Sequence, residues 1–291
     1  MKKLTVIVVV VITFCLMAFT RTTLARTSKA RPDAKAVLAQ TNAARAEAHS
    51  PMATSTCSFT FTSGNSTSFL KYCVTANGNI TQLETPEGKE HIAVGAAGEG
   101  YGICDLNPTG QSISYFDYAD FGDSGNWNPS TVVSQTTKVL KIARTTSDGI
   151  WTLTQPITQA SGSSPSVKLG LVLTNNSSTE RSVFLIRYAD VDASGSVLNS
   201  LDGTAKSAFG WNSAESPSPF GLVLENTGPF PFLTSPLGLT QNVPGGPNPC
   251  NFAAHLATGT QTATDGSILL LYARNLPKHA SKTVTVSYGG F

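Results

Sequence analysis

Two alternating segments within residues 166–188 most constrain what this chain can fold into. In Ser166–Thr174 an apolar side chain recurs at every second position, which predicts a strand with one buried face. Those apolar residues are Val167, Leu169, Leu171 and Leu173. In Arg181–Tyr188 both alternating faces are largely apolar, which predicts a central strand covered on both sides. The polar segment Asn175–Ser178 predicts a turn between the two strands, because short polar side chains bond to nearby backbone.

Short alternating runs bounded by turn residues continue through the chain from Cys57 onward. They predict about fourteen strands and no convincing helix after residue 50. Besides the two above, the predicted strands are Cys57–Thr62, Ser68–Thr75, Asn79–Glu84, His91–Val94, Tyr101–Cys104, Ser112–Tyr118, Thr137–Arg144, Ile150–Gln155, Gly221–Leu224, Asn251–Leu256, Ser267–Arg274 and Lys282–Tyr288. Asn77-Gly78 predicts a tight two-residue hairpin turn with positive φ at both residues. The pattern favours an all-β fold, a large antiparallel β-sandwich formed by residues 56–291 as a single domain.

The composition also favours an all-β domain of the extracellular type. Charged residues make up only 13% of the chain, which contains 25 Gly and 16 Pro. The net charge of +2 is unevenly distributed. Residues 1–50 carry 8 of the 20 basic side chains and 2 of the 18 acidic ones. Residues 51–291 carry the other 12 basic and 16 acidic side chains. This mildly acidic body argues against nucleic acid as a partner, because phosphate binding needs a basic face.

The first 25 residues have the build of a signal peptide or an N-terminal anchor. A basic start precedes an apolar run over residues 4–20. Two cleavage positions, after Ala18 and after Ala25, fit this pattern, and an uncleaved anchor is the alternative. Residues 26–55 are Ala-rich and basic, and we expect them to form a tether. We therefore expect a secreted, periplasmic or cell-envelope protein that contacts a membrane only through its N-terminal segment, if that segment is retained.

Four of the five cysteines lie in the β-rich body: Cys57, Cys73, Cys104 and Cys250. An even number in an exported chain predicts two disulfides, for which three pairings are possible. A Cys57–Cys73 bond would close a short local loop and leave Cys104–Cys250 to join the two ends of the sandwich. Metal binding is the competing interpretation, but the chain has no Cys-x-x-Cys pair and no histidine at ligand spacing from a cysteine pair.

Asp190–Gly195 matches the opening of a calcium-binding loop, with oxygen side chains at positions 1, 3 and 5 and Gly at position 6. The predicted metal ligands are Asp190, Asp192, Ser194 and Asp202. Asp202 is included because Leu201 occupies position 12, where a closing Glu would stand. Ca²⁺ is the cofactor that this pattern suggests. The alternative is an ordinary turn in which the Asp side chains bond to backbone amides.

A second acidic stretch, residues 117–128, combines carboxylates with aromatic rings. Its candidate ligand-binding residues are Asp117, Tyr118, Asp120, Asp123 and Trp127. Exposed rings would stack on pyranose faces while the carboxylates accept hydroxyl hydrogens, so a glycan or another cell-envelope component is the suggested partner. The alternative is a loop whose aromatic side chains fold back on the sandwich and whose acids are solvated.

Three phrases together resemble the large β-sandwiches of the galactose-mutarotase-like, or supersandwich, class. They are TTSDGIWTLTQPITQ at 145–159, LTNNSSTERSVFLIRY at 173–188 and LPKHASKTVTVSY at 276–288. The resemblance covers about residues 136–291 and lies in the rhythm of the strands rather than in a catalytic motif. That class is associated with carbohydrate-active enzymes and their accessory domains, although a fold alone does not define a function.

Three functional interpretations remain, and the sequence assigns no catalytic residue. His91, His255 and His279 stand alone, and the glutamates cannot be ranked as acids or bases. The main prediction is an exported, disulfide-stabilised, non-catalytic β-sandwich that binds or displays something at the cell envelope. The second is a carbohydrate-active enzyme or an accessory carbohydrate-binding domain that uses loop carboxylates and aromatics. The third is a purely structural envelope protein.

Overall fold

The structure is a computed structural model. It describes residues 57–92, 98–106, 110–119, 122–160, 165–215, 219–229, 248–254, 256 and 259–291, and the backbone of 233–238. The predicted signal segment and the tether lie outside these residues. The described residues all belong to one compact unit, His49–Phe291, and the predicted boundaries within residues 1–56 stay predictions.

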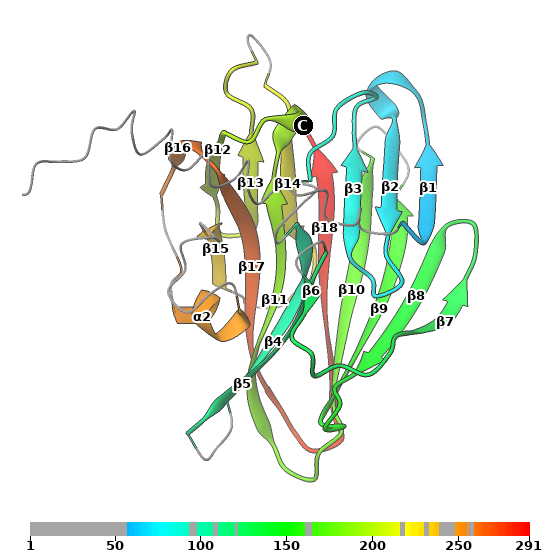
Figure 1. The fold of residues 1–291 in the computed structure, drawn as a ribbon, viewed down its shortest axis with the longest axis vertical. Helices are drawn as coiled ribbons and strands as arrows, with labels where there is room; N and C mark the ends of the chain where they lie inside the picture. Colours follow the sequence, from blue (N-terminus) through cyan, green and yellow to red (C-terminus); the bar gives the residue numbers. More distant parts are fainter. Residues whose placement is uncertain are drawn as a thin grey trace, which may run out of the picture. The chain divides into compact units, whose positions relative to one another are not determined.

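The described residues form sheets of nine, six and three strands, and all pairings between neighbouring strands are antiparallel (Figure 1). The strands of the nine-stranded sheet are β7 (Thr131–Gln135), β8 (Val139–Thr145), β9 (Trp151–Ala160), β10 (Ser166–Asn175), β12 (Asn199–Gly203), β13 (Ser207–Trp211), β14 (Gly221–Asn226), β16 (Gln261–Thr264) and β18 (Ser281–Gly290). Their order in the sheet is β16-β12-β13-β14-β18-β10-β9-β8-β7. The all-β class and the antiparallel sandwich are therefore confirmed.

The other two sheets lie side by side and face the nine-stranded sheet (Figure 1). The six-stranded sheet contains β4 (Glu99–Leu106), β5 (Ser112–Tyr118), β6 (Gly122–Asp123), β11 (Arg181–Val191), β15 (Leu233–Gly238) and β17 (Gly266–Leu276), in the order β15-β17-β11-β4-β5-β6. The three-stranded sheet contains β1 (Phe59–Ser63), β2 (Leu70–Val74) and β3 (Ile80–Glu84). The short helical turns η1 (Ser66–Ser68) and η2 (Ala193–Gly195) and the helix α2 (Pro249–Ala254) complete the described elements.

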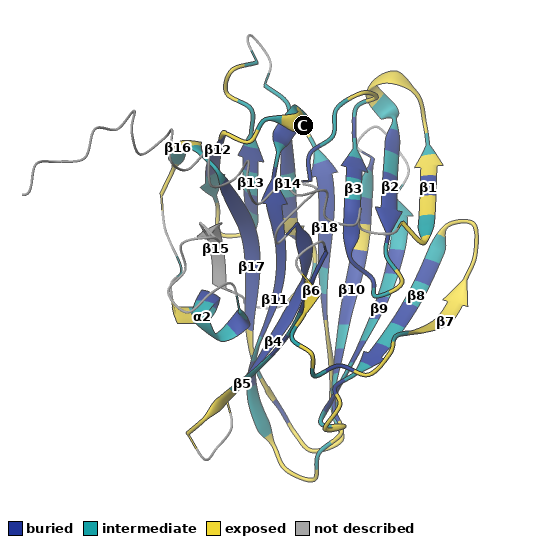
Figure 2. Ribbon diagram, in the orientation of Figure 1, coloured by how far each residue is buried: buried dark blue, intermediate teal, exposed yellow. Residues whose placement is uncertain are grey.

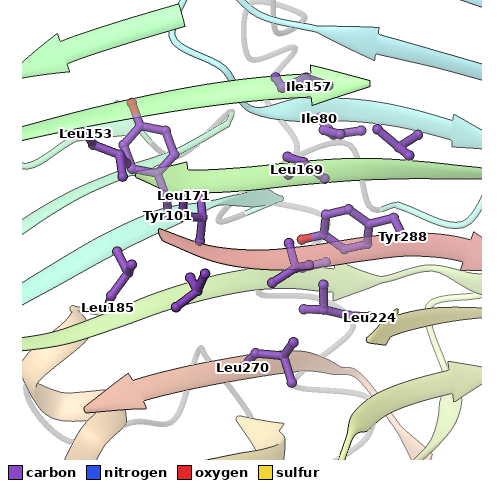
Figure 3. Packing of buried hydrophobic residues seen from close by; sticks show 14 of the residues in the cluster. Ile80, Tyr101, Leu153, Ile157, Leu169, Leu171, Leu185, Leu224, Leu270 and Tyr288 are labelled. Atoms are coloured by element: carbon purple, nitrogen blue, oxygen red, sulfur yellow. The ribbon is translucent and has the colours of Figure 1, made fainter. Parts of the chain in front are cut away.

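The core lies between these layers, where alternate residues of each strand meet (Figure 3). On β10 the residues predicted to be apolar and inward are buried, and Leu169 pairs in register with Ile157 of β9 and Val286 of β18. Lys168, on the opposite face, is exposed. Figure 2 shows the central strands buried, whereas the edge strand β7 is exposed along its whole length. The predicted half-buried face of Ser166–Thr174 is thus confirmed.

The two segments that organise the sequence do not pair with each other. β10 bonds to β9 and β18, whereas β11 bonds to β4 and β17 in the opposite layer. The polar turn carries the chain across the sandwich, and its first residue, Asn175, is buried with its amide donating to Leu276 O at 3.0 Å. β11 is a central strand buried on both faces, as predicted: Leu185 lies in the main core and Ile186 in a second cluster on the outer side.

Other expectations need local correction. The predicted strand Asn251–Leu256 is wrong, because Pro249–Ala254 is the helix α2. Its start carries a helix signal: the Asn248 side chain accepts the Asn251 N–H at 3.0 Å, and a proline follows the cap. His91–Val94 forms no strand in its described part, only an isolated bridge from Ile92 to Val191. Six strands were not predicted: β6, β7, β12, β13, β15 and β16.

The Asn77-Gly78 hairpin is present, although its turn differs from the prediction. Only Gly78 has a positive φ, of 91°. The Gly78 N–H donates to Thr75 O at 3.1 Å and the Thr75 N–H donates to Asn79 O at 2.9 Å, so the turn is longer than a two-residue loop. The pairing of β2 with β3 also shifts register beside this turn, between Cys73 and Val74.

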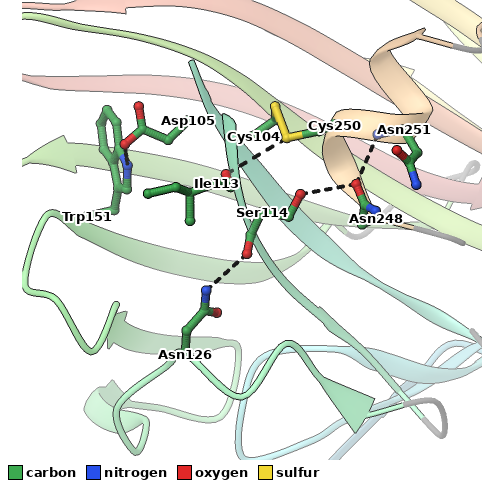
Figure 4. Close-up of a disulfide and its surroundings, with 9 residues drawn as sticks. All are labelled: Cys104, Asp105, Ile113, Ser114, Asn126, Trp151, Asn248, Cys250 and Asn251. Carbon is green, nitrogen blue, oxygen red and sulfur yellow. Dashed lines mark hydrogen bonds between the residues drawn. A yellow bond between two sulfur atoms is a disulfide. The ribbon is translucent and has the colours of Figure 1, made fainter. Parts of the chain in front are cut away.

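The four cysteines of the body form two disulfides, Cys57–Cys73 and Cys104–Cys250. The first closes a short loop against β2, as the local pairing predicts. The second joins β4 to α2 rather than the two ends of the sandwich, and so fastens α2 to the six-stranded sheet (Figure 4). Two disulfides indicate that the chain folds in an oxidising compartment.

Candidate functional site

The predicted calcium ligands make separate hydrogen bonds. Asp190, at the end of β11, accepts the Ser267 hydroxyl at 3.2 Å. Asp202 in β12 accepts the Thr260 hydroxyl at 2.6 Å. In the described part of the chain, no three His, Cys, Asp or Glu side chains gather where they could hold one metal ion. Calcium binding by these residues stays a prediction.

Ser194 lies in η2 with a left-handed φ of 54°, which is uncommon for a residue other than glycine. Its hydroxyl donates to Glu215 Oε2 at 2.9 Å, and its N–H donates to His91 Nδ1 at 3.4 Å. The N–H of Asp192, the preceding ligand candidate, donates to His91 O at 3.2 Å. The turn is therefore held by a histidine and a glutamate that sequence analysis did not connect to it.

The second acidic stretch does not offer the exposed rings that sugar stacking requires. The Tyr118 side chain is fully buried, and Trp127 is only 8% exposed with its indole N–H donating to Phe116 O at 3.1 Å. Asp120 lies outside the described residues. The expectation of exposed aromatics at Tyr118 and Trp127 is thus corrected: the Trp127 ring packs in the main core, and the Tyr118 ring packs near Phe252 of α2 on the outer face of the six-stranded sheet.

The remaining acids of this stretch pair with one arginine of β8. Arg144 forms ion pairs with Asp117, which is buried, and with Asp123, whose Oδ2 lies 2.5 Å from Nη2. The guanidinium also lies over the Trp127 ring, 5.4 Å from its centroid. Burial raises the pKa of Asp117, and Arg144 opposes this effect. Arg144 is 27 residues from Asp117 in the sequence, and no local pattern indicated that the two would pair.

A buried arginine connects all three sheets. Arg187 of β11 donates through Nε to Glu99 Oε1 of β4 at 2.5 Å, and both side chains are fully buried. Its Nη1 donates to Gln155 Oε1 in the nine-stranded sheet at 2.7 Å. Its Nη2 donates to Gly78 O in the turn of the three-stranded sheet at 3.1 Å. This side chain therefore fixes the three sheets to one another.

Glu99 completes the buried cluster by accepting three donors. Besides Arg187, they are the Tyr288 hydroxyl at 2.7 Å and the Ile80 N–H at 2.6 Å. Burial raises the pKa of Glu99, and the positive charge of Arg187 opposes that rise. Three donors directed at two oxygens fit the ionised carboxylate, which only accepts hydrogen bonds.

The hairpin turn at Asn77–Asn79 is inserted into this polar interior. The Asn79 amide donates to Glu99 O at 3.2 Å and Asp117 O at 3.0 Å, and the Asn77 amide donates to Asp117 Oδ2 at 2.8 Å. A Cβ at Gly78 would lie 2.5 Å from Gln155 Nε2, and the φ of 91° is one that other residues rarely adopt, so glycine is favoured there. The hairpin was predictable from Asn-Gly, but its burial between sheets was not.

A second group of polar side chains joins three segments that are distant in sequence. His91 is fully buried, and its Nε2 lies 2.7 Å from Thr85 O. Because Thr85 O can only accept and the Ser194 N–H can only donate, the ring is neutral with its proton on Nε2. Burial lowers the pKa of His91, in agreement with this state. Lys89 Nζ lies 2.6 Å from Glu215 Oε1, and this hydrogen bond lowers the pKa of Glu215.

A set of aromatic rings lies on the outer face of the nine-stranded sheet. In β13, Ala208 and Gly210 are buried while Phe209 and Trp211 alternate with them and are half-buried. The rings of Phe209 and Trp211 are stacked with centroids 5.8 Å apart, and Phe291 meets Phe209 edge-on at 6.3 Å. Phe291 is 49% exposed. Sequence analysis missed this set because it had not predicted β13.

Comparisons with known proteins identify a fold and no family. No protein-family model matches the chain, and no curated protein matches its sequence. A bacterial glucoamylase complexed with acarbose has a TM-score of 0.52 and 13% identity, over 81% of this chain and 32% of its own. The Slr1438 protein from Synechocystis sp. PCC 6803 has a TM-score of 0.46 and 9% identity, over 81% of this chain and 97% of its own.

This chain therefore spans about a third of the length of the glucoamylase, and at this identity the likeness shows a shared fold alone. It agrees with the resemblance to large β-sandwiches that the sequence carries. Within the described residues, no helix is long and apolar enough to cross a membrane.

Proposed function

We propose that this protein is an exported, disulfide-stabilised β-sandwich that acts as a non-catalytic binding or structural component of the cell envelope or the extracellular space. The observation that carries this proposal is how two of its buried carboxylates, Glu99 and Asp117, are used. Glu99 and Asp117 are both paired with arginines inside the sandwich, where they also hold the hairpin turn. A hydrolase of glycosides needs two carboxylates that face the substrate, and these two face other parts of the protein.

The disulfides support the exported location, because such bonds persist in oxidising compartments. Export is tested by expressing the full chain and a variant that lacks residues 1–25 in a bacterium, followed by fractionation and thiol alkylation. We expect the full chain outside the cytoplasm, with Cys57, Cys73, Cys104 and Cys250 resistant to alkylation, and the shortened chain in the cytoplasm with reactive thiols. A full chain that stays in the cytoplasm with four reactive thiols in residues 57–291 would contradict the proposal.

A second candidate function, glycan binding, is favoured by the rings on the outer sheet face. Phe209, Trp211 and Phe291 are partly exposed and adjacent, and such rings stack on the apolar faces of sugars. We expect Trp211→Ala to weaken retention by a polysaccharide in affinity electrophoresis, whereas Lys168→Ala, on the same sheet face but outside the ring set, leaves it unchanged. Equal retention of both variants and the unaltered protein would exclude this surface.

A further inference from the structure

The outer face of the six-stranded sheet contains a seat that is filled by a segment of the same chain. In β4, Gly102 pairs in register with Phe116 of β5 and Ile186 of β11, so it leaves a gap between two rows of large side chains. A Cβ at Gly102 would lie 2.3 Å from Pro249 Cγ. The proline ring of α2 therefore occupies the space that the missing side chain leaves.

A second residue of α2 fills the neighbouring part of this seat. The Phe252 ring is 1% exposed and stacks on Tyr188, with centroids 5.4 Å apart and planes 16° apart. It also lies 6.2 Å from the ring of Tyr118. Pro249 and Phe252 are three residues apart, so one turn of helix presents both to the sheet. We call the surface formed by Gly102, Tyr118, Ile186 and Tyr188 the α2 seat.

α2 depends on its attachments, because a six-residue helix is not stable alone. The Cys104–Cys250 disulfide joins it covalently to β4, next to the seat (Figure 4). At its start, Asn248 Oδ1 accepts the Ser114 hydroxyl at 3.1 Å as well as the Asn251 N–H. The disulfide keeps Pro249 and Phe252 at the seat at a high effective concentration, which excludes any other segment.

We infer that the α2 seat is a peptide-binding surface that α2 occupies in cis, and that the Cys104–Cys250 disulfide controls access to it. When the disulfide is reduced, the seat accepts from another molecule a peptide with proline and an aromatic residue three positions apart. That partner chemistry is the one shown by the present occupant, in which proline meets the backbone of β4 and the aromatic ring stacks on a tyrosine.

The reductant is a dithiol, such as a protein with two neighbouring cysteines. Cys104 is 1% exposed, whereas Cys250 is partly exposed, so the reductant's thiolate attacks the Cys250 sulfur. The S–S bond breaks, a mixed disulfide forms at Cys250, and Cys104 leaves as a thiolate that takes a proton. The second thiol of the reductant then displaces the Cys250 thiol. The reductant supplies two electrons and becomes a disulfide.

The test uses a fluorescein-labelled peptide with the sequence of residues 248–254, with serine in place of its cysteine, and fluorescence anisotropy. We expect no binding to the oxidised protein. The variant Cys104→Ser/Cys250→Ser/Phe252→Ala, whose own α2 lacks its ring and its bond, is expected to bind the peptide. Adding Gly102→Ala to this variant should weaken binding at least tenfold, because the new Cβ takes the place of the proline ring.

Absence of binding to the vacated variant, or binding that Gly102→Ala does not weaken, would overturn the inference. If these variants do not fold, amide hydrogen exchange of the unaltered protein decides. After reduction by dithiothreitol, we expect exchange in residues 250–254 to rise while that in β4 and β11 stays unchanged. Equal protection of α2 in the oxidised and reduced protein would overturn the inference.

Discussion

Individual buried polar residues connect parts of this protein that are distant in sequence. Arg187 is the main example, because its guanidinium has one hydrogen-bond partner in each of the three sheets. Removing one member of such a group leaves the others buried without a partner, which makes the arrangement specific to one packing of the sheets. Asn79 acts similarly, since its side chain bonds to the backbone of both β4 and β5.

At the residue scale, Asp148 provides a prediction about pH. Its carboxylate accepts the Thr146 hydroxyl at 2.6 Å, the Tyr115 hydroxyl at 2.5 Å and the Ile150 N–H at 3.0 Å. Partial burial raises its pKa, but these hydrogen bonds outweigh burial, so the pKa lies below its ordinary value. We expect Asp148→Asn to lower the free energy of unfolding at pH 7 by about 1 kcal/mol, a small effect because water screens the site.

The pKa of folded Asp148 is depressed, so its contribution is present above the ordinary carboxyl pKa of about 4 and disappears as pH falls through the folded pKa. Urea unfolding from pH 7 to pH 3 should therefore show the two proteins converging in acid. Glu180→Gln, at an exposed position, is the matched control and should change little at any pH. A gap between wild type and Asp148→Asn that stays constant down to pH 3 would contradict this account.

At the scale of elements, periodicity predicted single strands well and their pairing poorly. The alternation in Ser166–Thr174 gave the correct buried face, because one side of β10 meets the core. It did not show that β10 and β11 lie in opposite layers. Polar turn residues such as Asn175–Ser178 occur both in hairpins and in connections that cross between sheets. Only tertiary contacts distinguish these two kinds of turn.

The helix α2 and the candidate sites also depend on contacts that local sequence patterns do not reveal. Residues 251–256 look apolar enough for a strand, but Asn248 followed by Pro249 is a helix start, which the sequence analysis did not consider. In the acidic stretch, the number of acids and rings was visible, whereas the arginine that binds two of the acids comes from β8. His91 and Glu215 were visible only as isolated residues, since the loops that they join are far apart in sequence.

The η2 turn is the element on which the calcium prediction depends. Binding through Asp190, Asp192, Ser194 and Asp202 predicts that calcium raises the Tm of the oxidised protein relative to a chelator. Free calcium at about 100 times its Kd would stabilise the native state by about 2.7 kcal/mol. The rise should disappear in Asp192→Ala and persist in Glu180→Ala, measured by differential scanning fluorimetry. An unchanged Tm at millimolar calcium would leave η2 as an ordinary turn.

At the scale of the whole molecule, two smaller sheets together cover one face of the largest sheet. The nine-stranded sheet is faced by the six-stranded and three-stranded sheets, and one apolar core contains residues from all three. The hairpin turn Asn77–Asn79 brings the small sheet to the polar cluster at Glu99 and Arg187. Unfolding of any one sheet should therefore expose the partners of the other two, which predicts cooperative unfolding.

We propose that Glu99, with its buried partners, serves the fold rather than a reaction, and the free energy of unfolding of Glu99→Gln tests this proposal most directly. Gln places an amide donor against the donors that Glu99 now accepts. We predict a loss of about 3–5 kcal/mol in denaturant unfolding, typical of breaking a buried ion pair. Glu225→Gln, at an exposed position of β14, should change stability by less than about 0.5 kcal/mol. A buried acid that is kept for catalysis lowers the stability of the protein. A Glu99→Gln protein that is as stable as wild type, or more stable, would therefore contradict a structural role for Glu99.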